Sequence, residues 1–137
     1  MKLSQEQVAH FDQEGFLFFP DWFSSDEANL LLEEAALVYG LERKEVLRET
    51  SGVARTAFAA HTYNEAFSRL GRHPRLIAPV VQILGDAVYM HQYKVNAKAA
   101  FDGEVLQWPP DFGTLHRADE MPEPLAMNTA ASLADVT

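Results

Sequence analysis

Cysteine is absent from this sequence of 137 residues. Its absence excludes disulfide scaffolds, zinc sites built on thiolates and catalysis by a thiol nucleophile. Basic residues are also scarce, because 11 Lys and Arg stand against 20 Asp and Glu and give a formal net charge of −9. Nucleic acids and anionic membranes reward positive charge, so we expect neither as a partner.

Long apolar runs are missing as well, and none approaches the roughly 20 residues that a membrane-spanning helix needs. The first seven residues, Met1 to Gln7, contain no apolar stretch of the kind found in a signal peptide. The sequence also has no glycine-rich phosphate loop and no HExxH pair of histidines on one helix. We therefore expect a cytoplasmic protein with neither a phosphate-loop nor a zincin site.

The composition that is present, 47% hydrophobic and 23% charged, is typical of a globular domain. A chain of this length holds one domain at most. We expect residues 1–137 to form a single unit, with 1–85 mainly helical and 86–137 supplying strands.

Capping residues predict four helices. Each candidate begins after a polar N-cap or a proline, and three of them stop at or beside a glycine. Pro79 falls inside the last helix, where it removes a backbone donor and predicts a kink or a restart. The helices are bounded by Ser4 and Gly15, Ser24 and Gly40, Asn64 and Leu70, and Pro74 and Gly85.

Strands are predicted where β-type residues alternate or form short runs. Residues 41–50, which are charged, are expected to form a loop or a solvated helix, and Phe16 and Phe18 are expected in the core. The predicted strands are Ser51–Ala60, Asp86–Lys98, Leu106–Trp108 and Ala126–Asp135, with a short buried strand or turn at Phe16–Pro20.

The strand at Asp86–Lys98 has the clearest alternation, and one of its faces is unusual. Gln92, Lys94 and Asn96 share that face, although polar side chains at successive positions are uncommon in a core. The face either looks into a cavity or is the solvated side of an ordinary sheet. The pattern alone leaves both interpretations open.

One loop carries residues able to bind a metal. Asp111, His116 and Asp119 follow a predicted strand closely, and carboxylate with imidazole at a strand end is a common metal-binding arrangement. An ordinary polar loop has the same composition, so the spacing by itself does not decide between the two.

Two stretches of sequence nevertheless resemble a known family. They are Tyr89-Met90-His91-Gln92-Tyr93-Lys94-Val95-Asn96 and the run from Gln107 to His116, QWPPDFGTLH, followed by Met121-Pro122. Together with the opening Leu3–Phe16, they resemble the phytanoyl-CoA dioxygenase family of Fe(II)/2-oxoglutarate oxygenases, in its ectoine-hydroxylase-like branch. The resemblance extends over the whole chain but corresponds to roughly the N-terminal half of a family member.

The resemblance implies a fold and a set of site residues. The fold would be α+β, with N-terminal helices packed on a partial double-stranded β-helix, that is, an incomplete jelly roll. Family members hold Fe(II) with a His-x-Asp pair and a distal His, and they bind 2-oxoglutarate. Asp111 matches the iron carboxylate, Asn96 a residue that contacts 2-oxoglutarate, and Gln92 a residue that contacts substrate.

The same resemblance places Pro109 where the family has its first iron histidine. Proline offers no lone pair for a metal, so of the family's ligands only Asp111 remains. The distal histidine and the 2-oxoglutarate arginine would fall beyond Thr137. Further departures lie nearby, at Leu115, Ala118 and Glu120. We expect Fe(II) and 2-oxoglutarate not to be bound productively, and Pro109→His alone not to restore turnover.

Three functions remain open on this sequence. The first is a truncated, catalytically degenerate relative of the hydroxylases. The second is an interaction subunit that completes or regulates a homologous dioxygenase. The third is an active non-haem iron dioxygenase with a substituted site, in which His116 replaces the missing ligand beside Asp111.

An incomplete barrel also has consequences for association. Unpaired strand edges and an uncovered apolar face both favour association. We therefore expect the isolated chain to be marginally stable, to dimerise through its open sheet edge, or to be completed by a homologous subunit.

Overall fold

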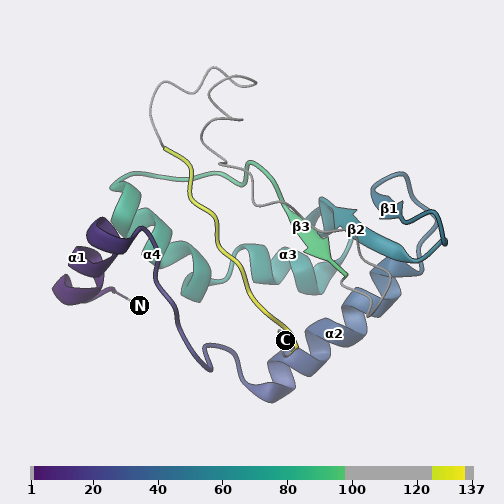
Figure 1. Ribbon diagram of the computed structural model, residues 1–137, viewed down its shortest axis with the longest axis horizontal. Helices are drawn as coiled ribbons and strands as arrows, with labels where there is room; N and C mark the ends of the chain where they lie inside the picture. Colours follow the sequence, from purple (N-terminus) through teal and green to yellow (C-terminus); the bar gives the residue numbers. More distant parts are fainter. Residues whose placement is uncertain (1, 98–124, 135–137) are drawn as a thin grey trace.

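Four α-helices, a short 3₁₀ helix and a three-stranded antiparallel sheet make up the regular structure of residues 2–97 and 125–134, which the computed structural model describes (Figure 1). The class is α+β, as expected. In chain order the elements are α1 (Gln5–Glu14), α2 (Ser25–Tyr39), β1 (Val46–Arg48), β2 (Ala54–Phe58), η1 (Ala60–Thr62), α3 (Glu65–Gly71), α4 (Pro74–Leu84) and β3 (Lys94–Asn96).

The first two helices begin at the predicted N-cap residues, and each has a capping box. The Ser4 hydroxyl accepts a hydrogen bond from the Gln7 backbone at 3.1 Å, and the Gln7 side chain accepts one from the Ser4 backbone at 2.9 Å. Ser24 and Glu27 repeat the arrangement at the start of α2. Gly15 ends α1 with a φ of 79°, a left-handed conformation that a side chain would strain.

The later helices are also bounded as predicted. Asn64 caps α3 by accepting a hydrogen bond from the Phe67 backbone at 3.0 Å, and α4 runs from Pro74 to Leu84 before Gly85. The restart that was one of the two outcomes expected at Pro79 does not occur, because α4 is assigned as one helix through that residue.

The sheet has the order β1-β2-β3, and its register places one row of apolar residues on the inner face. Val46 lies opposite Ala57, which in turn lies opposite Val95. All three are buried and belong to one cluster with α2 and α3. The flanking row, Leu47, Thr56 and Asn96, consequently faces the other way.

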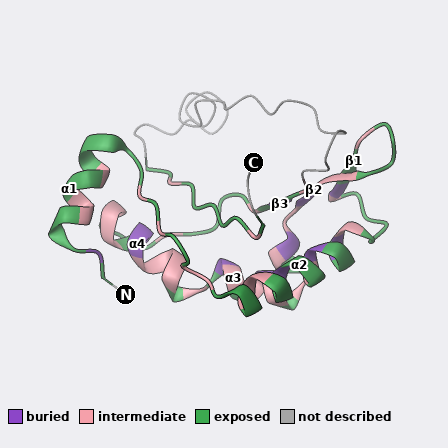
Figure 2. Cartoon of the chain, turned by 60° about the horizontal axis from the view of Figure 1, so that its bottom comes forward, coloured by how far each residue is buried: buried purple, intermediate pink, exposed green. Residues whose placement is uncertain are grey.

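The core lies between this inner face and the helices, where the buried residues gather (Figure 2). Phe67 of α3 is 1% exposed and fills its centre, while Ala57 and Ala60 are fully buried and let the helices approach closely. From α2 the buried side chains are Leu31, Ala35 and Val38.

The N-terminus is attached to α4 by a side-chain amide. Gln82 accepts a hydrogen bond from the Leu3 backbone N–H at 2.7 Å and donates one to the Leu3 carbonyl at 3.1 Å. This pairing, together with burial of the Leu3 side chain, fixes where α1 begins.

The long strand predicted at Asp86–Lys98 is mostly wrong, because only Lys94–Asn96 is a strand in the described residues. Its partner β2 ends at Phe58, since Ala59 adopts a left-handed conformation with a φ of 52° and turns the chain into η1. The segment before Tyr93 therefore has no length of β2 left to pair with. Two of the three strands, β1 and β2, also fall within residues 1–85.

Three other local expectations need correction. Residues 41–50 form a loop, as one of the two expectations had it, but this loop is interrupted by strand β1 at Val46–Arg48. Within the described residues of 126–135 there is no strand. Instead, the 125–134 segment runs across the helices toward α2, where Leu133 packs against the core (Figure 1). Phe16 and Phe18 are 59% and 79% exposed, so they are not core residues.

Candidate functional site

Asn96 lies on the outer face of the sheet, and its side chain is held in place. The buried hydroxyl of Thr56, on the neighbouring strand, donates a hydrogen bond to Asn96 Oδ1 at 3.0 Å. Register explains the contact, because Thr56 and Asn96 are directly opposite each other in the β2–β3 pair. The amide nitrogen Nδ2 is the second polar group of this side chain and can donate a hydrogen bond.

Lys94 and Gln92 extend this polar surface from Asn96 toward α4. Lys94 is exposed, and its Nζ lies 5.6 Å from the centre of the Phe58 ring. Gln92 is exposed and lies two residues before β3. Lys94 and Asn96 are thus exposed among the described residues, whereas Thr56 on the same face is buried.

Tyr93 anchors this segment from the opposite side. Its ring stacks on His61 with centroids 4.9 Å apart and meets Phe67 edge-on at 6.4 Å. Desolvation raises the pKa of the Tyr93 hydroxyl to about 12, so the side chain stays neutral and packs as an aromatic wedge. Gly71 makes room for it, since a Cβ there would lie 3.1 Å from Tyr93 Cε2.

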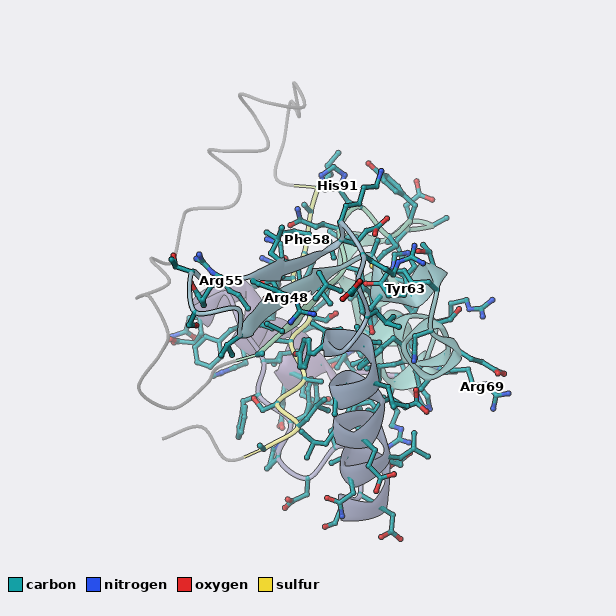
Figure 3. All side chains as sticks on the ribbon, turned by 90° about the vertical axis from the view of Figure 1, so that its right-hand side faces the viewer. Arg48, Arg55, Phe58, Tyr63, Arg69 and His91 are labelled. Carbon is teal, nitrogen blue, oxygen red and sulfur yellow. The ribbon has the colours of Figure 1, made fainter. Side chains whose placement is uncertain are left out.

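Arg48 connects β1, at the other edge of the sheet, to α2 through side-chain hydrogen bonds. From β1 its guanidinium donates to the carbonyls of Tyr39, at 2.8 Å, and Gly52, at 3.2 Å. It therefore joins the end of α2 to the β1–β2 turn, and its charge suits the negative end of that helix. Figure 3 shows Arg48 on β1, with Phe58 and Arg55 on β2.

A separate open pocket of about 400 Å³ lies between α1 and the exposed segment that follows it. Phe16, Leu17 and Phe18 line one side, and the His10 ring meets Phe16 edge-on at 6.0 Å. In Figure 1 this end of the molecule lies away from the sheet. The pocket contains none of the site residues predicted from the sequence.

The predicted metal ligands Asp111 and His116 lie outside the described residues, as does Pro109. Within residues 2–97 and 125–134, no three histidines or carboxylates come close enough to hold a metal ion. In the same part of the chain, no helix combines the length and apolarity needed to cross a bilayer. Gln92 and Asn96 are thus the predicted site residues that the structure brings onto one segment.

Thr56 is the site residue that sequence reasoning missed. It stands in a predicted strand of small apolar residues, where a polar side chain was a signal for a specific partner. The partner is forty residues away in sequence. Only the strand register reveals it.

Comparison with known proteins gives consistent relatives, although no family model matches the chain. Ectoine dioxygenase of Bordetella bronchiseptica is 36% identical over 138 residues, which cover 97% of this chain and 45% of that protein. The L-proline trans-4-hydroxylase of Streptomyces griseoviridis is 35% identical, over 93% of this chain and 48% of its own length.

Solved structures agree with the sequence relatives. The crystal structure of EctD from S. alaskensis with 2-oxoglutarate and 5-hydroxyectoine superimposes with a TM-score of 0.79 at 33% identity. It covers 88% of this chain, which spans 44% of that structure. The resemblance inferred from the sequence is confirmed: the chain is a relative of the ectoine-hydroxylase-like Fe(II)/2-oxoglutarate oxygenases and spans about half the length of the relatives it matches.

Proposed function

We propose that this chain is a catalytically degenerate relative of the Fe(II)/2-oxoglutarate hydroxylases, whose metal site is lost at Pro109. The main support for this proposal is the chemistry of the proline side chain. A proline stands where the resemblance puts the first iron histidine, and its side chain has no donor atom. The cofactors of the relatives, Fe(II) and 2-oxoglutarate, therefore do not fit the ligand set that this sequence offers.

Asp111 alone is a poor iron site. Fe(II) stands near the weak end of the affinity series for divalent metals, so it depends on several well-placed ligands. His116 is five residues further on, in place of the His-x-Asp spacing that suits one metal. The polar outer face, by contrast, keeps both Gln92 and the Thr56-supported Asn96. The retained polar residues and the incomplete metal ligands together support a protein that keeps the fold of its relatives but lacks their metal site.

Anaerobic Fe(II) titration, followed by calorimetry and by the thermal midpoint, tests the proposal. The wild-type chain, Pro109→His, and Pro109→His with Asp111→Asn are compared, each with and without 2-oxoglutarate. A ligand that binds only the folded state raises stability by about 2.7 kcal/mol at a hundred times its dissociation constant. We expect no shift for the wild type, a measurable gain for Pro109→His, and loss of that gain in the double variant.

The same titration separates the degenerate relative from an active enzyme with a substituted site. Wild-type binding as tight as that of Pro109→His, abolished by His116→Ala, would establish the substituted site and overturn the proposal. Hydroxylation of ectoine or L-proline by the wild-type chain would overturn it too. Ectoine and L-proline are chosen because the relatives are named for these compounds.

A second candidate function is interaction with a homologous dioxygenase, which the chain would complete or regulate. This role is supported by exposed apolar side chains on β1 and on the segment that precedes β3. Leu47 is 47% exposed, Tyr89 is 80% exposed and Met90 is 41% exposed. Titrating the chain into a purified ectoine dioxygenase, with mass and hydroxylation rate as readouts, tests this role. An unchanged mass and rate would exclude it. We further propose a cytoplasmic setting, because the sequence contains no cysteine.

A further inference from the structure

The open pocket beside α1 contains polar groups that the fold itself does not use. In the described part of the chain, the Glu6 carboxylate and the ring nitrogens of His10 make no hydrogen bond and no ion pair. The volume of about 400 Å³ is that of a site for a small molecule. The walls consist of three residues of α1 and three of the segment that follows it: Glu6, Gln7, His10, Phe16, Leu17 and Phe18.

The two walls of the pocket are only loosely joined. No side chain of α1 is buried (Figure 2), and the buried residue that anchors this end, Leu3, precedes the helix. The walls meet where the His10 ring contacts Phe16 edge-on at 6.0 Å. Phe16 and Phe18 are 59% and 79% exposed, so a ligand between the walls would remove aromatic surface from water.

The charge around the pocket is negative. From Ser4 to Trp22 the sequence has four acidic residues and no Lys or Arg. Arg75, which reaches this stretch at the Trp22 carbonyl, is already paired with Glu27. An anion would therefore be repelled here, whereas a cation would be attracted. The four acidic residues are Glu6, Asp12, Glu14 and Asp21.

The aromatic residues favour one kind of cation. The faces of aromatic rings attract cations, and alkylated ammonium groups are the ligands most often recognised in this way. A bare metal ion, by contrast, needs several oxygen or nitrogen ligands, and Glu6 is the only carboxylate in the walls. The combination of one unpaired carboxylate with exposed phenyl rings thus fits an ammonium group that carries apolar substituents.

We propose that the pocket between α1 and Phe16–Phe18 binds a small organic cation. Its ammonium group lies beside the Glu6 carboxylate and the exposed phenyl rings, and its apolar part packs against Leu17. The pocket contains no residue of the lost metal site, so this binding is independent of Pro109 and of the iron titration.

Three probes of the same branched shape test the charge of the ligand. They are choline, its uncharged isostere 3,3-dimethylbutan-1-ol, and the anion 3,3-dimethylbutanoate. Each is titrated into the ¹⁵N-labelled full chain while backbone amide shifts are followed. We expect saturable shifts with choline, centred on residues 6–18, binding about tenfold weaker for the alcohol, and none for the anion. No shift with choline, or equal binding of choline and the alcohol, would overturn the proposal.

A matched pair of charge variants tests the location of the site. Glu6→Gln and Asp12→Asn each remove one negative charge from α1, but the two positions face different sides of the helix, about 240° apart. Glu6→Gln should weaken choline binding by about threefold, and Asp12→Asn should leave it nearly unchanged. Equal effects would mean that choline responds only to overall charge, and would contradict a defined site.

Phe18→Leu tests the contribution of the aromatic ring. Leucine keeps an apolar side chain at this position but has no aromatic face, so choline should bind about threefold more weakly while the uncharged alcohol is little affected. Circular dichroism checks that each variant keeps its helices. An equal loss for choline and the alcohol would reduce the role of Phe18 to apolar contact and would contradict recognition of a cation by the ring.

Discussion

The indole of Trp22 donates a hydrogen bond to the Arg75 carbonyl at 3.3 Å. That carbonyl lies four residues before Pro79, whose ring nitrogen cannot supply the usual helical donor. Trp22 thus satisfies the acceptor that the proline leaves open, which is consistent with α4 continuing through Pro79. Arg75 returns the contact, since its guanidinium donates to the Trp22 carbonyl at 2.5 Å.

Trp22→Phe should therefore destabilise the fold, by about 1 kcal/mol for the lost hydrogen bond, when urea unfolding is measured. The control is Pro79→Ala, which gives the helix its own donor. In that background the cost of Trp22→Phe should shrink, because the Arg75 carbonyl is already satisfied. Equal costs in both backgrounds would show that the indole acts only through packing.

The Glu27–Arg75 ion pair predicts an acid-dependent loss of stability. Hydrogen bonding to the Arg75 guanidinium, and then to the Ser24 backbone, lowers the pKa of the Glu27 carboxyl from 4.5 to about 2. A lowered pKa in the folded state means that the stabilisation is complete above pH 4.5 and is lost as the pH falls toward 2. Glu27→Gln should flatten the unfolding free energy over that window. An unchanged slope would assign the acid sensitivity to other carboxylates.

Gly71→Ala should destabilise the protein, although alanine normally strengthens a helix. Its Cβ would lie 3.1 Å from Tyr93 Cε2 and 3.4 Å from Met90 Cε. The Tyr93 ring is itself packed on His61 and Phe67, so it has little freedom to move. We expect a net loss of about 1–3 kcal/mol. Tyr93→Leu should reduce that loss, and thermal unfolding of the four variants in the cycle measures it.

The Thr56–Asn96 hydrogen bond is expected to contribute about 1 kcal/mol. Thr56→Val keeps the shape but removes the hydroxyl donor, and Asn96→Ala removes the acceptor. If the contact is specific, the double variant should be less destabilised than the sum of the two single variants. Strict additivity would mean that Asn96 is held by its backbone alone.

The helices could be predicted from sequence because their signals are local. Ser4 with Gln7 and Ser24 with Glu27 are three residues apart, so a capping box is visible without any tertiary information. The strands were harder to predict from the sequence. β1 falls in a charged stretch, and its pairing depends on the turn at Gly52, whose φ of 87° becomes meaningful only once both strands are known.

The candidate site could likewise be predicted only where its features are local in sequence. Gln92 and Asn96 could be placed on one segment from alternation alone, but Thr56 could not be added because its contact depends on register. Asp86–Tyr93 has the composition of a strand and still forms none, since pairing requires a neighbour and Ala59 ends β2 too early. Asp111 and His116 stay predictions of the sequence.

The order β1-β2-β3 also has a consequence for folding kinetics. β1 and β2 are neighbours in the chain, whereas β3 joins them only after η1, α3 and α4 have been traversed. Closing the shorter loop costs less conformational entropy, so the hairpin is expected to form before β3 docks. By the same reasoning, β3 should be the first strand released in a partial opening, and its amides should exchange with deuterium sooner than those of β1 and β2.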